Sequence, residues 1–214
     1  MEKQKLTKFS DIVYYYKWYA IVFVVIVLMV LFMVRECGNI VKDDAVVTML
    51  LSSEVPPEAA EEIANDFCSA EVFDDLTGDG VLSVYVNPIT IPYETASEEA
   101  YNAAMQASLA LTSEEGLLFF VDEDLLELYE ENGFFTDISE KAIKLGKSGD
   151  DVYTDSEGKV IGISLKGNEY LEKKGINTET LYACFKVSSI QDTDKYMLML
   201  KAAEDIFEYV TDVN

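Results

Sequence analysis

The sequence contains no histidine, which removes the commonest general base and the commonest protein ligand for transition metals. Ser-His-Asp and Cys-His catalytic arrangements are therefore excluded, and no glycine-rich phosphate-binding loop is present. Basic residues are also scarce, since 16 Lys and Arg stand against 40 Asp and Glu. Such an acidic surface repels phosphate backbones, so we expect no nucleic-acid partner. These absences favour a binding or structural protein over an enzyme, and we expect no cofactor and no metal site.

Cysteine is the second residue type in short supply, with three among 214 residues. Three cysteines do not make a disulfide framework. Cys68 and Cys184 fall at apolar positions of an expected helix and an expected strand, so both are interpreted as core residues. A Cys68–Cys184 bridge is the alternative outside the cytoplasm, and it would leave Cys37 unpaired.

One long apolar run dominates the N-terminal region. Residues Trp18 to Val34 (WYAIVFVVIVLMVLFMV) carry no charge, no Gly and no Pro. A helix of this length spans roughly 25 Å, and residues 13–16 can supply the turn needed to cross a bilayer core of about 30 Å. We therefore expect a single-pass membrane protein with a basic tail (1–17), a transmembrane helix (18–34), a linker (35–44) and one domain (45–214).

The flanking charges predict the orientation of this helix. Four lysines precede it (Lys3, Lys5, Lys8 and Lys17), whereas few basic residues follow it closely. The positive-inside bias then places the N-terminus in the cytoplasm and the domain outside the cell membrane. A cleaved signal peptide is the rival interpretation, but the run ends in bulky and charged residues. A lipoprotein cysteine at Cys37 is disfavoured in the same way, because Val34, Arg35 and Glu36 are not small.

The domain is strongly acidic and long enough for one substantial core. Residues 1–35 hold five basic and two acidic residues, which leaves 11 basic and 38 acidic residues for the rest, a net charge of −27.

The apolar strands of the domain alternate with helices, which predicts a three-layer α/β domain with a mostly parallel, mixed sheet. The expected elements are strands at 45–51, 81–86 and 116–121, helices opened by Pro56-Pro57, by Thr95 with Glu98 and by Asp122, a hairpin at 152–165, a helix at 168–174, a strand at 181–187 and a final helix capped by Asp192.

The loop from Asp75 to Gly80 matches the opening of a calcium-binding EF-hand loop. The twelfth position of that motif needs a bidentate Glu, whereas this chain has Val86 there. A strand rather than a helix is also expected to follow. We interpret the loop as a tight turn, with calcium binding as the weaker alternative.

Polar residues at the ends of the expected parallel strands form the best candidate binding site. In open α/β sheets, ligands bind outside the carboxyl ends of the strands. This rule selects Ser52, Ser53, Tyr93 and Asp122 as ligand-binding candidates. The alternative is that these are ordinary loop and capping residues.

Two stretches resemble bacterial extracellular solute-binding proteins. They are GLLFFVDEDLLELYEENGFFTDIS (116–139) and KVIGISLKGNEYLEKKGI (159–176), the latter followed by LYACFKVSS. The resemblance implies one lobe of a periplasmic-binding-protein-like fold, ligand binding without catalysis, and a transporter as partner. The second lobe and the lipid-modified cysteine of such proteins have no counterpart here. The stretch DIVYYYKWYAIVF (11–23) resembles the anchors of small membrane proteins of Firmicutes.

The sequence thus favours a membrane-anchored, extracytoplasmic binding domain that takes a ligand or a partner. The alternative from another class is a structural or assembly module without a ligand, whose acidic surface docks a basic envelope protein. A hydrolase that uses only carboxylates, with Asp122 and Glu123 as candidates, is a third and weaker hypothesis.

Overall fold

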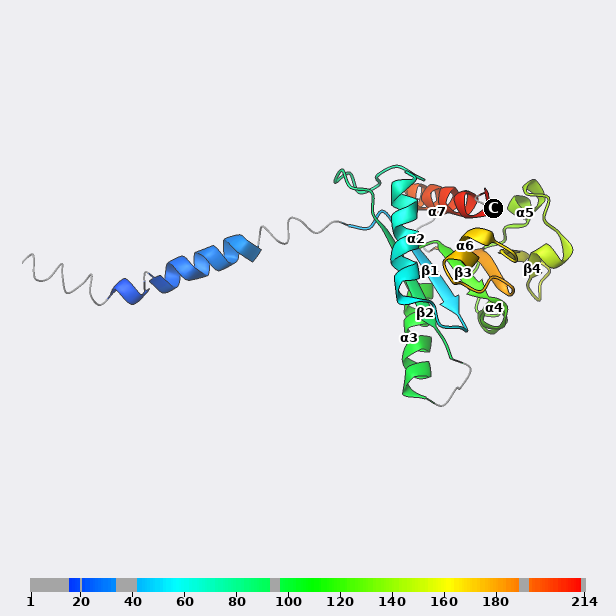
Figure 1. Cartoon of the computed structure of the whole chain (residues 1–214), viewed down its shortest axis with the longest axis horizontal. Helices are drawn as coiled ribbons and strands as arrows, with labels where there is room; N and C mark the ends of the chain where they lie inside the picture. Colours follow the sequence, from blue (N-terminus) through cyan, green and yellow to red (C-terminus); the bar gives the residue numbers. More distant parts are fainter. Residues whose placement is uncertain (1–15, 20, 34–41, 93–96, 189–192, 213–214) are drawn as a thin grey trace, which may run out of the picture. The chain divides into compact units, whose positions relative to one another are not determined.

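The computed structural model describes residues 16–19, 21–33, 42–92, 97–188 and 193–212 (Figure 1). The chain forms two compact units, residues 1–41 and residues 42–214. The first unit contains a helix, Tyr16–Met33, with a mean hydropathy of 2.3 and exposed side chains at its described residues. This helix is long and apolar enough to cross a membrane, a property that a signal sequence shares. Val34, the expected end of the span, lies outside the described residues.

The second unit is an α/β domain in which strands and helices alternate through the first half. The elements in chain order are β1 (Ala45–Leu51), α2 (Pro57–Ser69), β2 (Val84–Thr90), α3 (Glu98–Thr112), β3 (Leu118–Asp122), α4 (Glu123–Glu130), α5 (Ser139–Lys144), a 3-10 turn (Gly149–Asp151), β4 (Val152–Thr154), β5 (Val160–Ser164), α6 (Glu169–Lys173), β6 (Leu181–Phe185) and α7 (Asp194–Asp212).

The six strands form one mixed sheet in the order β2-β1-β3-β6-β5-β4. β1 is parallel to both β2 and β3, whereas the contacts β3–β6, β6–β5 and β5–β4 are antiparallel. The predicted α/β class is therefore confirmed. The antiparallel half comes from the hairpin and the strand that follow Ser139 in the sequence.

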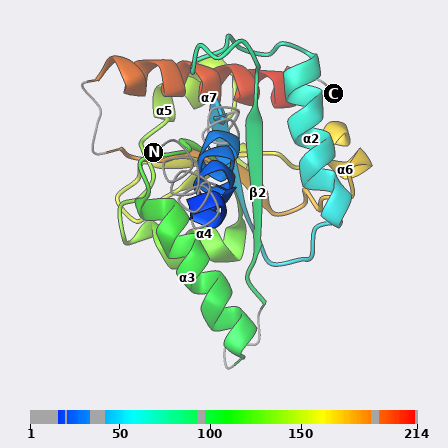
Figure 2. The same cartoon turned by 90° about the vertical axis from the view of Figure 1, so that its left-hand side faces the viewer.

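Helices cover both faces of this sheet. One core cluster joins α2 and α7 to the sheet through residues such as Phe67 and Phe207, and the other joins α3 and α4 through residues such as Leu111 and Leu126. Figure 2 shows α2 and α3 on either side of β2. The central strands contribute to both clusters, which explains why the continuous apolar run of β1 (AVVTMLL) is buried almost throughout.

The second strand differs from its predicted bounds. The sequence suggests that Pro88 ends it, but β2 runs to Thr90 and contains Pro88. β2 is an edge strand, and the backbone N–H of Ile91 donates to the carbonyl of Leu51 at 2.8 Å. Because backbone groups alternate in direction along a strand, the nitrogen of Pro88 faces the free edge, where it removes no bond from the sheet.

The cap of α3 differs from the one expected, whereas the cysteines agree with their interpretation as core residues. Ser97 caps α3, its hydroxyl accepting from the N–H of Ala100 at 3.1 Å. The expected caps Thr95 and Asp192 lie outside the described residues. Cys68 and Cys184 are both free and pack in different clusters, so the sheet separates them and the alternative disulfide is not formed.

Candidate functional site

The carboxyl ends of β1 and β3 meet at one edge of the sheet. The two strands are parallel neighbours, with Leu50 opposite Val121. The chain therefore leaves both strands on the same side. There the backbone N–H of Ser52 donates to the Asp122 carboxylate (Oδ2) at 2.7 Å. The structure thus brings two of the four candidate residues into direct contact.

Asp122 is the last residue of β3 and is 5% exposed. Its carboxylate makes no capping bond to the helix α4 that follows. It accepts instead from Ser52 and, at 3.5 Å, from the hydroxyl of Thr180, while the N–H of Glu123 donates to the Thr180 carbonyl at 2.8 Å. Asp122 therefore ties together the ends of β1 and β3 and the start of β6. Thr180 is a member of this site that sequence reasoning missed.

The edge continues toward β2. Ser53 is exposed, and its carbonyl accepts from the hydroxyl of Thr90, the last residue of β2, at 3.5 Å. Tyr93, the fourth candidate, lies outside the described residues. The carboxyl edge is defined here as Ser52, Ser53, Thr90, Asp122 and Thr180.

This edge lies at the point where the connections diverge. After β1 the chain passes to α2 on one face of the sheet, and after β3 it passes to α4 on the other face. In open α/β sheets this switch point is where ligands bind.

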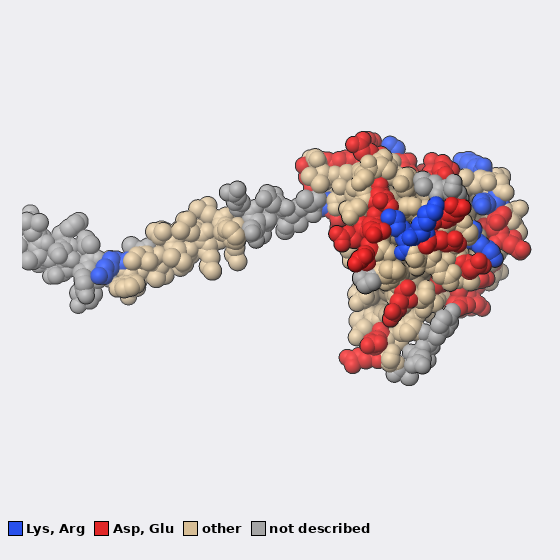
Figure 3. All heavy atoms as spheres, viewed as in Figure 1, with Lys and Arg blue, Asp and Glu red and all other residues tan. Residues whose placement is uncertain are grey.

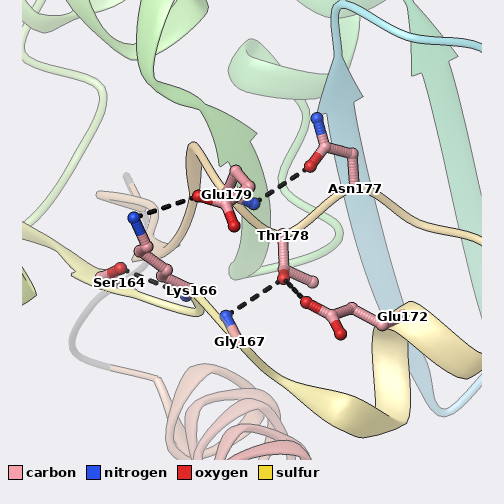
Figure 4. Close-up of polar contacts among 7 residues, drawn as sticks. All are labelled: Ser164, Lys166, Gly167, Glu172, Asn177, Thr178 and Glu179. Atoms are coloured by element: carbon pink, nitrogen blue, oxygen red, sulfur yellow. Dashed lines mark hydrogen bonds and ion pairs between the residues drawn. The ribbon is translucent and has the colours of Figure 1, made fainter.

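The loops beside the carboxyl edge are held by internal hydrogen bonds (Figure 4). Thr178 is 1% exposed, and its hydroxyl accepts from the N–H of Gly167 at 3.2 Å and donates to Glu172 Oε1 at 2.8 Å. It thereby joins the loop after β5 to the loop before β6. Lys166 and Glu179 form an exposed ion pair at 3.0 Å across the same two loops. The segment that positions Thr180 is therefore ordered by its own contacts.

The helices that begin at this edge carry acids in their first turns. Glu58 lies in the first turn of α2, and Glu123 and Asp124 lie in the first turn of α4. Negative side chains at a helix N-terminus are favourable because they complement the helix dipole. They also occupy the position at which a helix attracts an anion, so the edge disfavours anionic ligands.

The Asp75 loop uses its carboxylates within the protein. Asp75 accepts from the N–H groups of Gly78 and Gly80, both at 2.7 Å, and these backbone bonds hold the pKa of Asp75 below its usual value. Asp44, which is buried, accepts from Leu76, Thr77 and Ser83. The geometry favours the tight turn over calcium. Within the described residues, no group of three or more Asp, Glu or Cys could hold a metal ion.

A small hollow lies at the other end of the sheet. It has a volume of about 150 Å³ and lies between α7 and the 73–76 loop, with Phe73, Leu198 and Lys201 in its lining. Asp44, which binds this loop, directly precedes β1, so the hollow is near the amino end of the strand. Pockets for small molecules are typically about 300–1,000 Å³, so this hollow is a poor candidate for one.

The chemistry of the carboxyl edge suits positioning and hydrogen bonding. The Asp122 carboxylate is engaged with a backbone N–H and a hydroxyl, neither of which gives up a proton at neutral pH. Its role in this arrangement is to hold Ser52 and Thr180 in place. Around it, Ser53 and Glu123 are exposed and available to a bound molecule.

No family model matches the sequence, and no curated protein matches it. Among solved structures the chain is similar to an ABC substrate-binding protein from Listeria monocytogenes in complex with cycloalternan. The two are 18% identical with a TM-score of 0.31, and the match covers 55% of this chain and 28% of that chain.

Proposed function

We propose that this chain is a single-pass membrane protein that carries its α/β domain outside the cell and binds a neutral or cationic ligand at the carboxyl edge, without catalysis. The observation that carries the proposal is the divergence of the connections after β1 and β3, with Ser52 and Asp122 in contact between them. Ligands of open α/β sheets bind at such a point.

The charges around the edge select the class of ligand. Glu58 and Glu123 occupy the helix N-termini that would otherwise attract an anion. Sugars, neutral peptides and amines meet no such repulsion, and they can hydrogen-bond to the serine, threonine and carboxylate oxygens. A transporter in the same membrane is the partner that would use such a ligand-binding domain.

A thermal-shift screen of the domain (residues 42–214), which has its own core, tests the proposal. The screen contains sugars, oligopeptides, amino acids and polyamines. A ligand at about 100 times its dissociation constant adds roughly 2.7 kcal/mol to the free energy of unfolding. In a domain of this size we expect the melting temperature to rise by about 5–10 °C.

A matched pair of variants locates the binding. Ser53 and Ser156 are both exposed, but Ser156 lies in the β4–β5 turn, away from the carboxyl edge. Ser53→Trp should block the edge and remove the shift, whereas Ser156→Trp should keep it. Equal shifts in the two variants, or no shift with any compound, would contradict binding at this edge.

A second candidate function, an assembly module without a ligand, is favoured by the net charge of −27 in residues 36–214. Figure 3 shows acidic side chains spread over the visible face of the domain. Docking of a basic envelope protein on this surface would weaken steeply with added salt. A silent ligand screen together with stabilisation by a lysine-rich peptide, lost at high salt, would support this function.

A further inference from the structure

One face of α3 is exposed and apolar. Tyr101, Met105 and Leu109 are 65%, 49% and 64% exposed and follow each other at intervals of four residues. Residues at this spacing lie on one side of a helix. Ser108 and Thr112 lie on the same side. These five residues are called the α3 stripe.

The α3 stripe carries no charge, although the domain is strongly acidic. From Tyr101 to Ser113 the chain has no Asp, Glu, Lys or Arg, and the two acids of α3, Glu98 and Glu99, lie in its first turn. The helices α2, α4 and α7 each carry four or more charged residues. Figures 1 and 2 show the N-terminal half of α3 reaching beyond the sheet. An exposed helix face without charge is unusual on such a surface and indicates a contact face.

The serine and threonine hydroxyls of the stripe are already satisfied. Ser108 Oγ donates to the carbonyl of Ala104 at 2.9 Å, and Thr112 Oγ1 donates to the carbonyl of Ser108 at 2.8 Å. Bonds of this kind back to the helix's own carbonyls let the hydroxyls be buried without a polar partner. Apart from the Tyr101 hydroxyl, the stripe therefore presents an apolar surface.

We infer that the α3 stripe is the contact surface between two copies of this chain, which pack α3 against α3 about a two-fold axis near Met105. A two-fold contact requires a patch that is complementary to itself, and an apolar stripe without charge meets this requirement. Charge argues for a second copy over a basic partner. Two acidic domains can approach only where neither carries charge, whereas a basic partner would be drawn to the acidic surfaces instead.

The helix dipoles set the direction of the two helices. Acids lie at both ends of the stripe, Glu98 and Glu99 in the first turn of α3 and Glu114 and Glu115 just after the helix, so acids meet in either direction. An antiparallel pair aligns the two helix dipoles favourably, whereas a parallel pair opposes them. Tyr101 of one copy then faces Leu109 of its partner, with Met105 against Met105.

The size of the stripe predicts a weak contact. Its three large side chains would bury on the order of 400 Å² per copy, against the roughly 800 Å² per partner of stable complexes. The pairing therefore needs a high local concentration. Confinement of the anchored chains to one membrane, which is part of the proposed function, supplies it.

Disulfide crosslinking of the full chain in isolated membranes tests the pairing. In a chain with Cys37→Ser and Cys68→Ala, single cysteines replace Met105, Gln106 or Ile143. Gln106 is exposed on α3 but lies one position off the stripe, and Ile143 is 76% exposed on α5. We expect the crosslinked dimer with Met105→Cys and little with Gln106→Cys or Ile143→Cys. Added salt should raise the yield, because it screens repulsion between two acidic domains.

A second variant measures the same contact without a cysteine. Met105→Glu changes only an exposed side chain, so the domain should fold normally by circular dichroism. It places two carboxylates against each other at the axis, and we expect the dimer fraction of the full chain in detergent to fall at least about tenfold.

Two results would overturn the inference. The first is equal crosslinking at positions 105, 106 and 143. The second is a Met105→Cys crosslink only to a different protein, with a yield that falls as salt is added, which would indicate a charged partner. Ligand binding at the carboxyl edge is measured on the isolated domain, so failure of one proposal is distinguishable from failure of the other.

Discussion

At the scale of the residue, Lys186 is a buried lysine whose surroundings fix its hydrogen bonds and lower its pKa. It directly follows β6 and is 2% exposed. Its ammonium group donates to the carbonyls of Ala110, Ser113 and Glu115 at 3.2, 2.6 and 3.2 Å. The first two belong to the C-terminal end of α3, where helix carbonyls have no partner within the helix. Lys186 therefore caps α3 from a distant part of the chain.

Burial lowers the pKa of Lys186 to about 8, below the usual value near 10.5. Between about pH 8 and pH 10 the unfolded chain then binds more protons at this position than the folded domain does. Burial of the charged ammonium group lowers the free energy of unfolding below pH 8. This cost disappears as the pH rises from 8 to 10, because the buried group loses its proton. We therefore expect Lys186 to contribute a rise in the free energy of unfolding from pH 8 to pH 10.

Lys186→Met tests this linkage by urea unfolding at pH 7, 8, 9 and 10. At pH 7 we expect a loss of about 1–3 kcal/mol, because the carbonyls of Ala110, Ser113 and Glu115 lose the ammonium group that donates to them. The difference from the parent should widen toward pH 10, since the variant lacks the rise. Lys173→Met, which changes an exposed lysine, is the control. If the free energies of unfolding of the parent and of Lys186→Met change with pH in parallel, Lys186 is not the source of the rise between pH 8 and pH 10.

At the scale of elements, the start of α3 is a place where the sequence pattern and the structure differ. The pattern favours a capping box of Thr95 with Glu98, whereas the structure has Ser97 as the cap. Thr95 and Ser97 are both hydroxyl residues within one turn of the helix start. The spacing to Glu98 suggested Thr95 as the cap, and the backbone geometry at Ser97 supports Ser97.

We expect Ser97→Ala to destabilise α3 by about 1 kcal/mol, because the N–H of Ala100 loses its acceptor. Thr95→Ala, the matched change, should have little effect. The measurement is amide hydrogen exchange across the first two turns of α3, with the melting temperature alongside. Faster exchange in Thr95→Ala than in Ser97→Ala would show that Thr95 caps the helix, as the sequence pattern predicts.

The elements with a strong apolar pattern could be predicted from the sequence. β1 is confirmed at residues 45–51, and the β4–β5 hairpin and α6 lie where the pattern places them, within one residue at each end of α6. The second strand could not be placed correctly. Proline usually ends a strand, and only the edge position of β2 in the sheet makes Pro88 harmless there.

At the scale of the whole molecule, the N-terminal helix leads to a prediction about where the domain lies. If it anchors the chain, the protein should resist carbonate extraction, and the mass of the extracted chain should be the full 24.0 kDa. Protease added to intact cells should remove the domain, because the lysines before the helix predict an extracytoplasmic domain. A shortened chain that lacks the helix would show instead that it is a cleaved signal sequence.

The candidate site was predictable in part. The alternation of strands and helices indicated that Ser52 and Asp122 lie at the carboxyl ends of parallel strands. That their strands are neighbours, so that a 2.7 Å bond joins the two residues, comes from the structure. Thr180 was not predictable, because it precedes a strand. It reaches this edge only because β6 runs antiparallel to β3, with Leu181 opposite Asp122.

The sequence by itself determined the acidic domain, the apolar N-terminal helix and the alternation of strands and helices. These follow from composition and from periodicities of two and 3.6 residues, which are local properties of a chain. Only the tertiary structure decided the direction of β6, the burial of Lys186 against the end of α3 and the exposure of the α3 stripe. Each depends on which segments pack together, because an apolar residue on a helix has the same pattern whether a neighbour covers it or not.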